Sequence, residues 1–132
     1  MRAAFIVPFT MDFAAQAQDW IDAWNSHDLD RIMAHYSDDV ELVSPMVIKL
    51  TGRSDGAIRG KVRLRKYFAR GLEAYPGLCF DLRRLYPGVR SCVVEYRSIN
   101  GWMSAELMEF DAKGRISRVL AHYAEPDRDA SA

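Results

Sequence analysis

The sequence predicts an α+β domain in which helices pack on one face of a mostly antiparallel sheet. The first half of the chain has apolar residues at helical spacing, in stretches bounded by capping residues, glycine and proline. The second half has four segments of alternating side chains, joined by Pro-Gly, Asn-Gly and Lys-Gly pairs that are typical of hairpin turns. Helices followed by a run of hairpin-linked strands are typical of this class.

Three helices are expected in the first part of the chain. The first covers about residues 12–25. The second is short and starts at the N-cap Asp28. The third starts at Lys61 and ends at Pro76 and Gly77. The residues expected to face the core are, in chain order, Phe13, Ala17, Trp20, Trp24, Leu29, Ile32, Met33, Tyr36, Val62, Tyr67, Phe68 and Leu72.

A first strand is expected to end at Pro45, with Val40, Leu42 and Ser44 on one face. The stretch 47–60 holds three glycines and is expected to be a loop, with a short strand at 47–50 as an alternative. The sequence leaves open whether this loop is a lid. Four further strands are expected over about 78–86, 90–98, 102–111 and 115–123.

Charge and hydropathy exclude two classes of partner. Lys and Arg total 18 and Asp and Glu total 18, so the formal net charge is zero and no nucleic-acid surface is expected. No apolar run reaches the roughly 20 residues that span a bilayer, so no membrane partner is expected.

The ends of the chain are expected to lie outside the domain. The start, MRAAFIVPFT, has too short an apolar stretch and no clear cleavage site for a signal peptide, so residues 1–11 are expected to form an arm. The sequence leaves open whether translation starts at Met1 or Met11. Residues 12–124 are expected to form one domain, and residues 125–132 a flexible tail.

The two cysteines, Cys79 and Cys92, are expected to stay unpaired. If 78–86 and 90–98 form a hairpin, Cys79 lies opposite residue 96 or 97. A disulfide needs Cβ atoms within about 4.5 Å, which this register does not allow. Two free thiols indicate a reducing, cytoplasmic location.

The last strands are apolar on both faces. Met103, Ala105 and Leu107 share one face, and Met108 and Phe110 share the other. Helices can cover only one face of the sheet. The outer face is therefore expected to be buried in a two-fold homodimer.

The segment SAELMEF, residues 104–110, places a carboxylate among apolar side chains. Glu106 shares a strand face with Met108 and Phe110. Burial of an unpaired charged carboxylate costs several kcal/mol, so the group must either pair or stay protonated. Tyr96 and Tyr123 fall on the same inward face, and together these residues predict a small-molecule pocket. The alternative is a structural role, in which Glu106 only satisfies buried Tyr and Trp donors.

The pocket is expected to hold a small apolar ligand, with Glu106 as the candidate catalytic acid. No His or Cys cluster falls at metal-ligand spacing, and no phosphate loop or dinucleotide fingerprint occurs, so neither a metal nor a cofactor is expected. The candidate lining residues are Trp20, Trp24, Ser44, Tyr67, Val94, Tyr96, Trp102, Met108, Val119 and Tyr123.

Three stretches resemble the nuclear transport factor 2-like superfamily, in its SnoaL-like branch: WIDAWNSHDLDRIMAHYSDDVELVSP, IRGKVRLRKYFARGLEAYPGLCFDL and FDAKGRISRVLAHY. The resemblance covers roughly residues 12–124. It implies a cystatin-like cone, in which three helices pack on a strongly bent sheet with a cavity at the open end. Members include polyketide cyclases, dehydratases, ketosteroid isomerases, epoxide hydrolases and binding modules, so the resemblance implies a fold and not an activity.

The resemblance also argues against two of these activities. The Asp base of the ketosteroid isomerases falls on Ser44, which cannot shuttle a proton as Asp does. Their helix Tyr falls on Trp20, and their protonated Asp falls on Glu106. The last-strand Asp of the epoxide hydrolases falls near Ala121. The remaining expectation is cofactor-free acid/base chemistry of isomerase, cyclase or dehydratase type, and the alternative is a non-catalytic ligand-binding or protein-interaction dimer.

Overall fold

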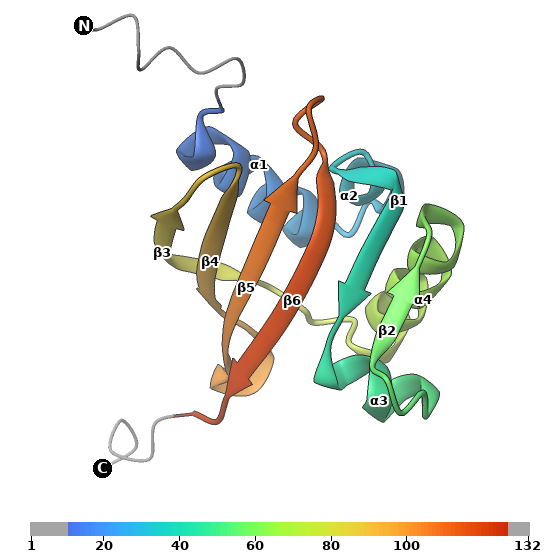
Figure 1. Ribbon diagram of the computed structural model, residues 1–132. Coiled ribbons are helices and arrows are strands. Elements are labelled where there is room, and N and C mark those ends of the chain that lie inside the picture. Colours follow the sequence, from blue (N-terminus) through green and yellow to red (C-terminus); the bar gives the residue numbers. More distant parts are fainter. Residues whose placement is uncertain (1–10, 127–132) are drawn as a thin grey trace, which may run out of the picture.

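Residues 11–126 are described by the computed structural model, in which helices lie against one face of a six-stranded sheet (Figure 1). This is the predicted α+β class. The elements, in chain order, are α1 (Phe13–Ser26), α2 (Leu29–Met33), β1 (Tyr36–Val43), α3 (Pro45–Thr51), β2 (Ala57–Arg59), α4 (Lys61–Ala74), β3 (Asp81–Pro87), β4 (Ser91–Arg97), the 3-10 helix η2 (Ile99–Gly101), β5 (Met103–Phe110) and β6 (Ile116–Ala124).

The first two helices begin after aspartate N-caps, Asp12 and the predicted Asp28. The Asp12 carboxylate accepts a hydrogen bond from the Ala15 N–H at 3.1 Å. Asp28 does the same for the N–H groups of Asp30 and Arg31. Each cap satisfies a backbone donor that has no partner within its helix. α1 ends at His27, whose positive φ of 59° turns the chain into α2.

The strands form one open sheet in the order β2-β1-β6-β5-β4-β3. β1 runs parallel to its neighbour β6, and the other neighbouring pairs are antiparallel. Register shifts interrupt the pairing of β1 with β6, of β3 with β4 and of β5 with β6. Such irregularities bend a sheet, and here they let it curve around the helices.

The stretch expected to be a loop holds a helix and a strand, so that prediction was wrong. Ser44 is the N-cap of α3, and its hydroxyl oxygen accepts from the Met46 N–H at 3.1 Å. Pro45 is tolerated because the first turn of a helix needs no N–H donor from it. Gly52 ends α3 at φ 76°, a conformation that glycine adopts without strain. The short strand lies at 57–59, not at 47–50.

Two other details of the helices differ from the expectation. Val62 is 72% exposed, and Leu64 is buried instead. Leu64, Tyr67 and Phe68 follow the three-and-four spacing of one helix face, whereas Val62 lies two residues before Leu64 and points away. The second helix ends at Met33, so Tyr36 is buried as the first residue of β1 and not as part of that helix.

The structure also bears on the predictions for the cysteines, for a membrane span and for the two ends of the chain. Both cysteines are free, because Cys92 lies opposite Pro87 and Cys79 precedes β3. Within residues 11–126, no helix is long and apolar enough to cross a membrane. The predicted arm and tail lie almost wholly in residues 1–10 and 127–132, outside the described part of the chain.

Candidate functional site

A cavity of about 470 Å³ lies between the inner face of the sheet and the helices α1, α3 and α4. Its walls are mostly aromatic and aliphatic, and among the described residues Glu106 is the one acidic side chain that lines it. A concave, largely apolar space with a few polar groups is the usual form of a small-molecule site.

Most of the predicted site residues lie on the wall of this cavity. Besides Glu106 they are Trp20 and Trp24 of α1, Ser44 before α3, Tyr67 of α4, Tyr96 of β4, Trp102 before β5, and Tyr123 of β6. The alternation of the strands brings Tyr96, Glu106 and Tyr123 together. Tyr96 and Tyr123 both lie opposite Ser104, two positions along from Glu106 on the neighbouring strands.

Val94, Met108 and Val119 do not line the cavity, so their prediction as lining residues is corrected. They lie on the inward face of the sheet, as their parity requires, but they are at most 2% exposed and belong to the hydrophobic core. Met108 is paired with Val119. Met108 is the next inward-facing residue after Glu106 along β5, towards the closed end of the cone. Helix α1 covers the sheet there, so no space remains.

Several wall residues were not predicted. Met46, Lys49 and Leu50 come from α3, and Ile99 and Asn100 from η2, because neither helix was expected. The Ser44-Pro45 pair was the signal for α3, since Ser is a favoured N-cap and Pro a favoured first residue. Phe80 lies outside any strand and carries no periodic signal. Tyr36 and Leu42 reach the wall from β1.

Glu106 is held by one protein donor. Its side chain is 7% exposed, and its Oε2 accepts a hydrogen bond from the Tyr96 hydroxyl. No described residue donates to Oε1. Burial raises the pKa of Glu106 from its usual 4.5 to about 7, although the Tyr96 hydrogen bond lowers it. The carboxyl group therefore exchanges its proton near neutral pH.

An aromatic cluster forms part of the cavity wall. The Phe80 ring packs on Tyr96 at a centroid distance of 4.3 Å and stacks on Trp20 at 5.7 Å. Asn25 positions Phe80, because its side-chain amide both donates to and accepts from the Phe80 backbone, at 2.9 and 2.7 Å. Trp20 Nε1 donates to the Tyr36 hydroxyl at 2.9 Å. Rings held in this way keep the Tyr96 hydroxyl aimed at Glu106.

A second polar contact lies under α3. The hydroxyl groups of Ser44 and Tyr123 are 3.3 Å apart, and either can be the donor. Burial raises the pKa of Tyr123 and of Tyr67, and the nearby Glu106 adds to both shifts. Both phenols therefore stay protonated at neutral pH and act as neutral hydrogen-bond donors.

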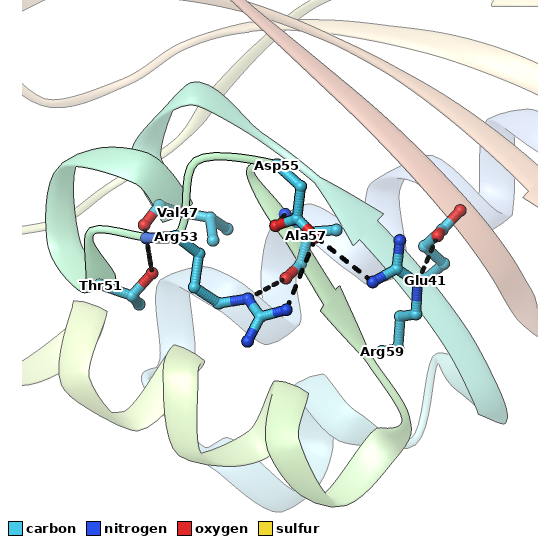
Figure 2. A network of polar contacts seen from close by, with 7 residues as sticks. All are labelled: Glu41, Val47, Thr51, Arg53, Asp55, Ala57 and Arg59. Carbon is cyan, nitrogen blue, oxygen red and sulfur yellow. Dashed lines mark hydrogen bonds and ion pairs between the residues drawn. The ribbon is translucent and has the colours of Figure 1, made fainter.

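Exposed ion pairs link the turn between α3 and β2 to β2 itself and to β1 (Figure 2). Arg59 contacts Glu41 at 3.0 Å and Asp55 at 3.5 Å. Arg53 contacts Asp55 at 3.6 Å and donates to the Ala57 carbonyl at 3.1 Å. Exposed pairs of this kind stabilise a protein by about 0–1 kcal/mol each, so the network contributes little to stability and joins the turn after α3 to β2 and β1.

Within residues 11–126, no three His, Cys, Asp or Glu side chains are grouped so that they could hold a metal ion. Glu106 stands alone on the wall as a carboxylate, and a single carboxylate without histidine or cysteine partners makes a poor metal site.

Comparisons with known proteins agree with this fold. A family model described as a SnoaL-like domain matches residues 17–119. The crystal structure of a SnoaL-like protein of unknown function from Burkholderia thailandensis has a TM-score of 0.84 and 39% sequence identity, and the match covers 90% of this chain and all of that one. No curated protein matches the chain significantly.

More distant structures share the fold alone. A protein of unknown function with a cystatin-like fold, from Methylobium petroleophilum, has a TM-score of 0.71 at 21% identity, over 92% of this chain and 83% of that one. A protein from Kribbella flavida that is provisionally named a ketosteroid isomerase has a TM-score of 0.67 at 20% identity, over 86% of this chain and 78% of that one. Their agreement extends to the helices and the bent sheet and not to an activity.

Proposed function

The chain belongs to the SnoaL-like family, and from this premise we propose that its cavity binds a small, largely apolar molecule to which Glu106 donates a proton. The observation that carries the proposal is a buried carboxyl group on the cavity wall, with one protein donor and a pKa of about 7. A general acid is most effective when its pKa lies near the working pH.

The proposed chemistry needs only side chains that line the cavity. The neutral Glu106 carboxyl donates its proton to a hydroxyl or carbonyl oxygen of the substrate. The carboxylate that remains keeps the hydrogen bond from Tyr96, and a charged acceptor strengthens that bond. In loss of water, the C–O bond breaks as the hydroxyl leaves as water, and the Glu106 carboxylate takes up the proton from the carbon beside the carbonyl, which restores the neutral acid. Proton-transfer chemistry on an enolisable or hydroxylated substrate, of isomerase, cyclase or dehydratase type, fits this arrangement without a cofactor.

The experiment compares the wild-type protein with Glu106→Gln. A suitable probe is the aldol adduct of benzaldehyde and acetone, which becomes a UV-absorbing conjugated enone when it loses water. We expect the wild-type protein to accelerate this loss below pH 7, and the Gln variant to lose the acceleration while its circular dichroism spectrum is unchanged. Equal rates and equal affinity for the probe in both proteins would refute the role of Glu106.

The second candidate is a ligand-binding or protein-interaction dimer without catalysis. Binding of the probe without turnover in either protein would favour it. The outer face of the sheet supports the dimer itself: Val93, Leu107 and Leu120 lie side by side on β4, β5 and β6 and are only partly exposed. We propose that a second copy of the chain covers this outer apolar stripe. Two free thiols support a cytoplasmic location.

A further inference from the structure

The contact between Ser44 and Tyr123 leaves one hydroxyl proton without a partner. The Ser44 oxygen already accepts from the Met46 N–H at 3.1 Å, and it lies 3.3 Å from the Tyr123 oxygen. The two hydroxyl groups carry two protons, and one contact between them uses one proton. If Ser44 donates, the Tyr123 proton remains, and if Tyr123 donates, the Ser44 proton remains. Either arrangement offers one O–H donor, and both residues line the cavity.

Tyr67 adds a second donor to the same part of the cavity. Its side chain is buried and lines the wall, and its hydroxyl makes no hydrogen bond within residues 11–126. Tyr67 comes from α4 and Tyr123 from β6, both line the cavity, and the pKa of Tyr67 is raised by burial and by the nearby Tyr123 and Glu106. Because both phenols stay protonated at neutral pH, this part of the cavity donates hydrogen bonds and cannot take up a proton.

This donor group is separate from Glu106 but close to it. Tyr123 and Glu106 are diagonal neighbours on adjacent antiparallel strands, which places such side chains about 7–8 Å apart. One molecule of modest size can therefore contact both. Glu106 interacts with one oxygen of that molecule, and the hydroxyl groups of Ser44, Tyr123 and Tyr67 are left for another.

We propose that Ser44, Tyr123 and Tyr67 form a second subsite that binds a carbonyl oxygen of the substrate, so that the substrate carries two oxygen functions, as a β-hydroxy ketone does. This inference rests on the proposed function of Glu106. A carbonyl oxygen has two lone pairs and no proton, so it accepts from both donors of the subsite at once.

The test compares a ketone with the hydrocarbon of the same shape. We would measure the affinities of α-tetralone and tetralin by ligand-observed NMR. The proteins are the wild type, Tyr67→Phe and the double variant Ser44→Ala/Tyr123→Phe. Tyr86→Phe is the matched control, because the Tyr86 hydroxyl bonds to Glu95 at the surface, away from the cavity. For each variant the measured quantity is the ratio of its affinity for the ketone to its affinity for the hydrocarbon. A loss of stability lowers both affinities alike and leaves this ratio unchanged.

We expect the wild type and the Tyr86 control to bind the ketone about 3–10-fold more tightly than the hydrocarbon, which is the effect of one or two hydrogen bonds. The ratio should fall towards one in Tyr67→Phe and in the double variant. A ratio near one in the wild type would overturn this subsite and leave the proposed pocket standing. An unchanged ratio in both cavity variants would also overturn it. Failure of both compounds to bind would overturn the subsite and the pocket together.

Discussion

Replacing Glu106 by Gln should change the pH dependence of stability in a defined direction. The pKa of Glu106 is about 7 in the folded protein and 4.5 when the group is fully solvated. Below pH 4.5 the carboxyl is neutral in both states, and its burial carries no charge penalty. Between pH 4.5 and 7 the unfolded chain releases this proton while the folded protein keeps it, so stability falls as the pH rises through this window and is level above pH 7. The shift corresponds to about 3 kcal/mol of lost stability, at about 1.4 kcal/mol per pKa unit.

The assay is urea unfolding at several pH values between 4 and 8, at one fixed protein concentration. Gln is similar in shape and does not titrate, so the Gln variant should gain about 3 kcal/mol on the wild type across this range. Glu109→Gln, on the outer side of the same strand, shows what the loss of an exposed carboxylate does. A difference between Glu106→Gln and wild type that stays constant with pH would refute the reasoning, because Glu106 would then titrate alike in both states.

Three further predictions follow from particular contacts. Tyr96→Phe removes the hydrogen bond that lowers the pKa of Glu106, so in the same urea series the pH-dependent stability loss should extend to higher pH and become larger. Gly56→Ala places a Cβ 3.1 Å from the Ser44 carbonyl oxygen at a φ of 64°, and should cost about 1–2 kcal/mol in thermal unfolding. Leu107→Glu puts a charge in the outer apolar stripe and should halve the mass measured by sedimentation, whereas a wild-type monomer would contradict the dimer.

The strand alternation is the part of the site that could be read from the sequence. Side chains two residues apart share a strand face, so Glu106 had to follow Ser104 and Met108 to the inward face. Hairpin turns then fixed which residues of β4 and β6 lie beside it. Face and register are local properties of the backbone, which explains why Tyr96, Glu106 and Tyr123 were correctly placed together.

The sequence did not show how deep in the cone each inward-facing residue lies. Met108 and Val119 have the correct parity, but parity does not say how far the core extends along the sheet. That distance depends on how side chains from separate elements pack. Val94 lies directly opposite Glu106 and is covered by other core side chains, which parity does not show either. The helix α3 was missed for another reason: Ser44 and Pro45 fit a strand end as well as a helix start, and only the bond to the Met46 N–H distinguishes the two.

The side chains on the cavity wall that can gain or lose a proton predict the pH profile of any reaction there. Glu106 is the one acidic residue on the wall, and the tyrosines beside it stay neutral because burial raises their pKa. Ser44 stands where a proton-accepting Asp would be needed for two-group catalysis, and it can only donate or accept a hydrogen bond.

If one acidic group carries the reaction, the plot of kcat/KM against pH falls on one side only. Catalysis by neutral Glu106 should be constant at low pH and fall about tenfold per pH unit above pH 7, measured as kcat/KM for loss of water from the aldol adduct. In Tyr96→Phe the fall should begin at higher pH, because the neutral form of Glu106 then persists further. A bell-shaped profile would mean that a second group takes part in the reaction, and catalysis by Glu106 alone would then be wrong.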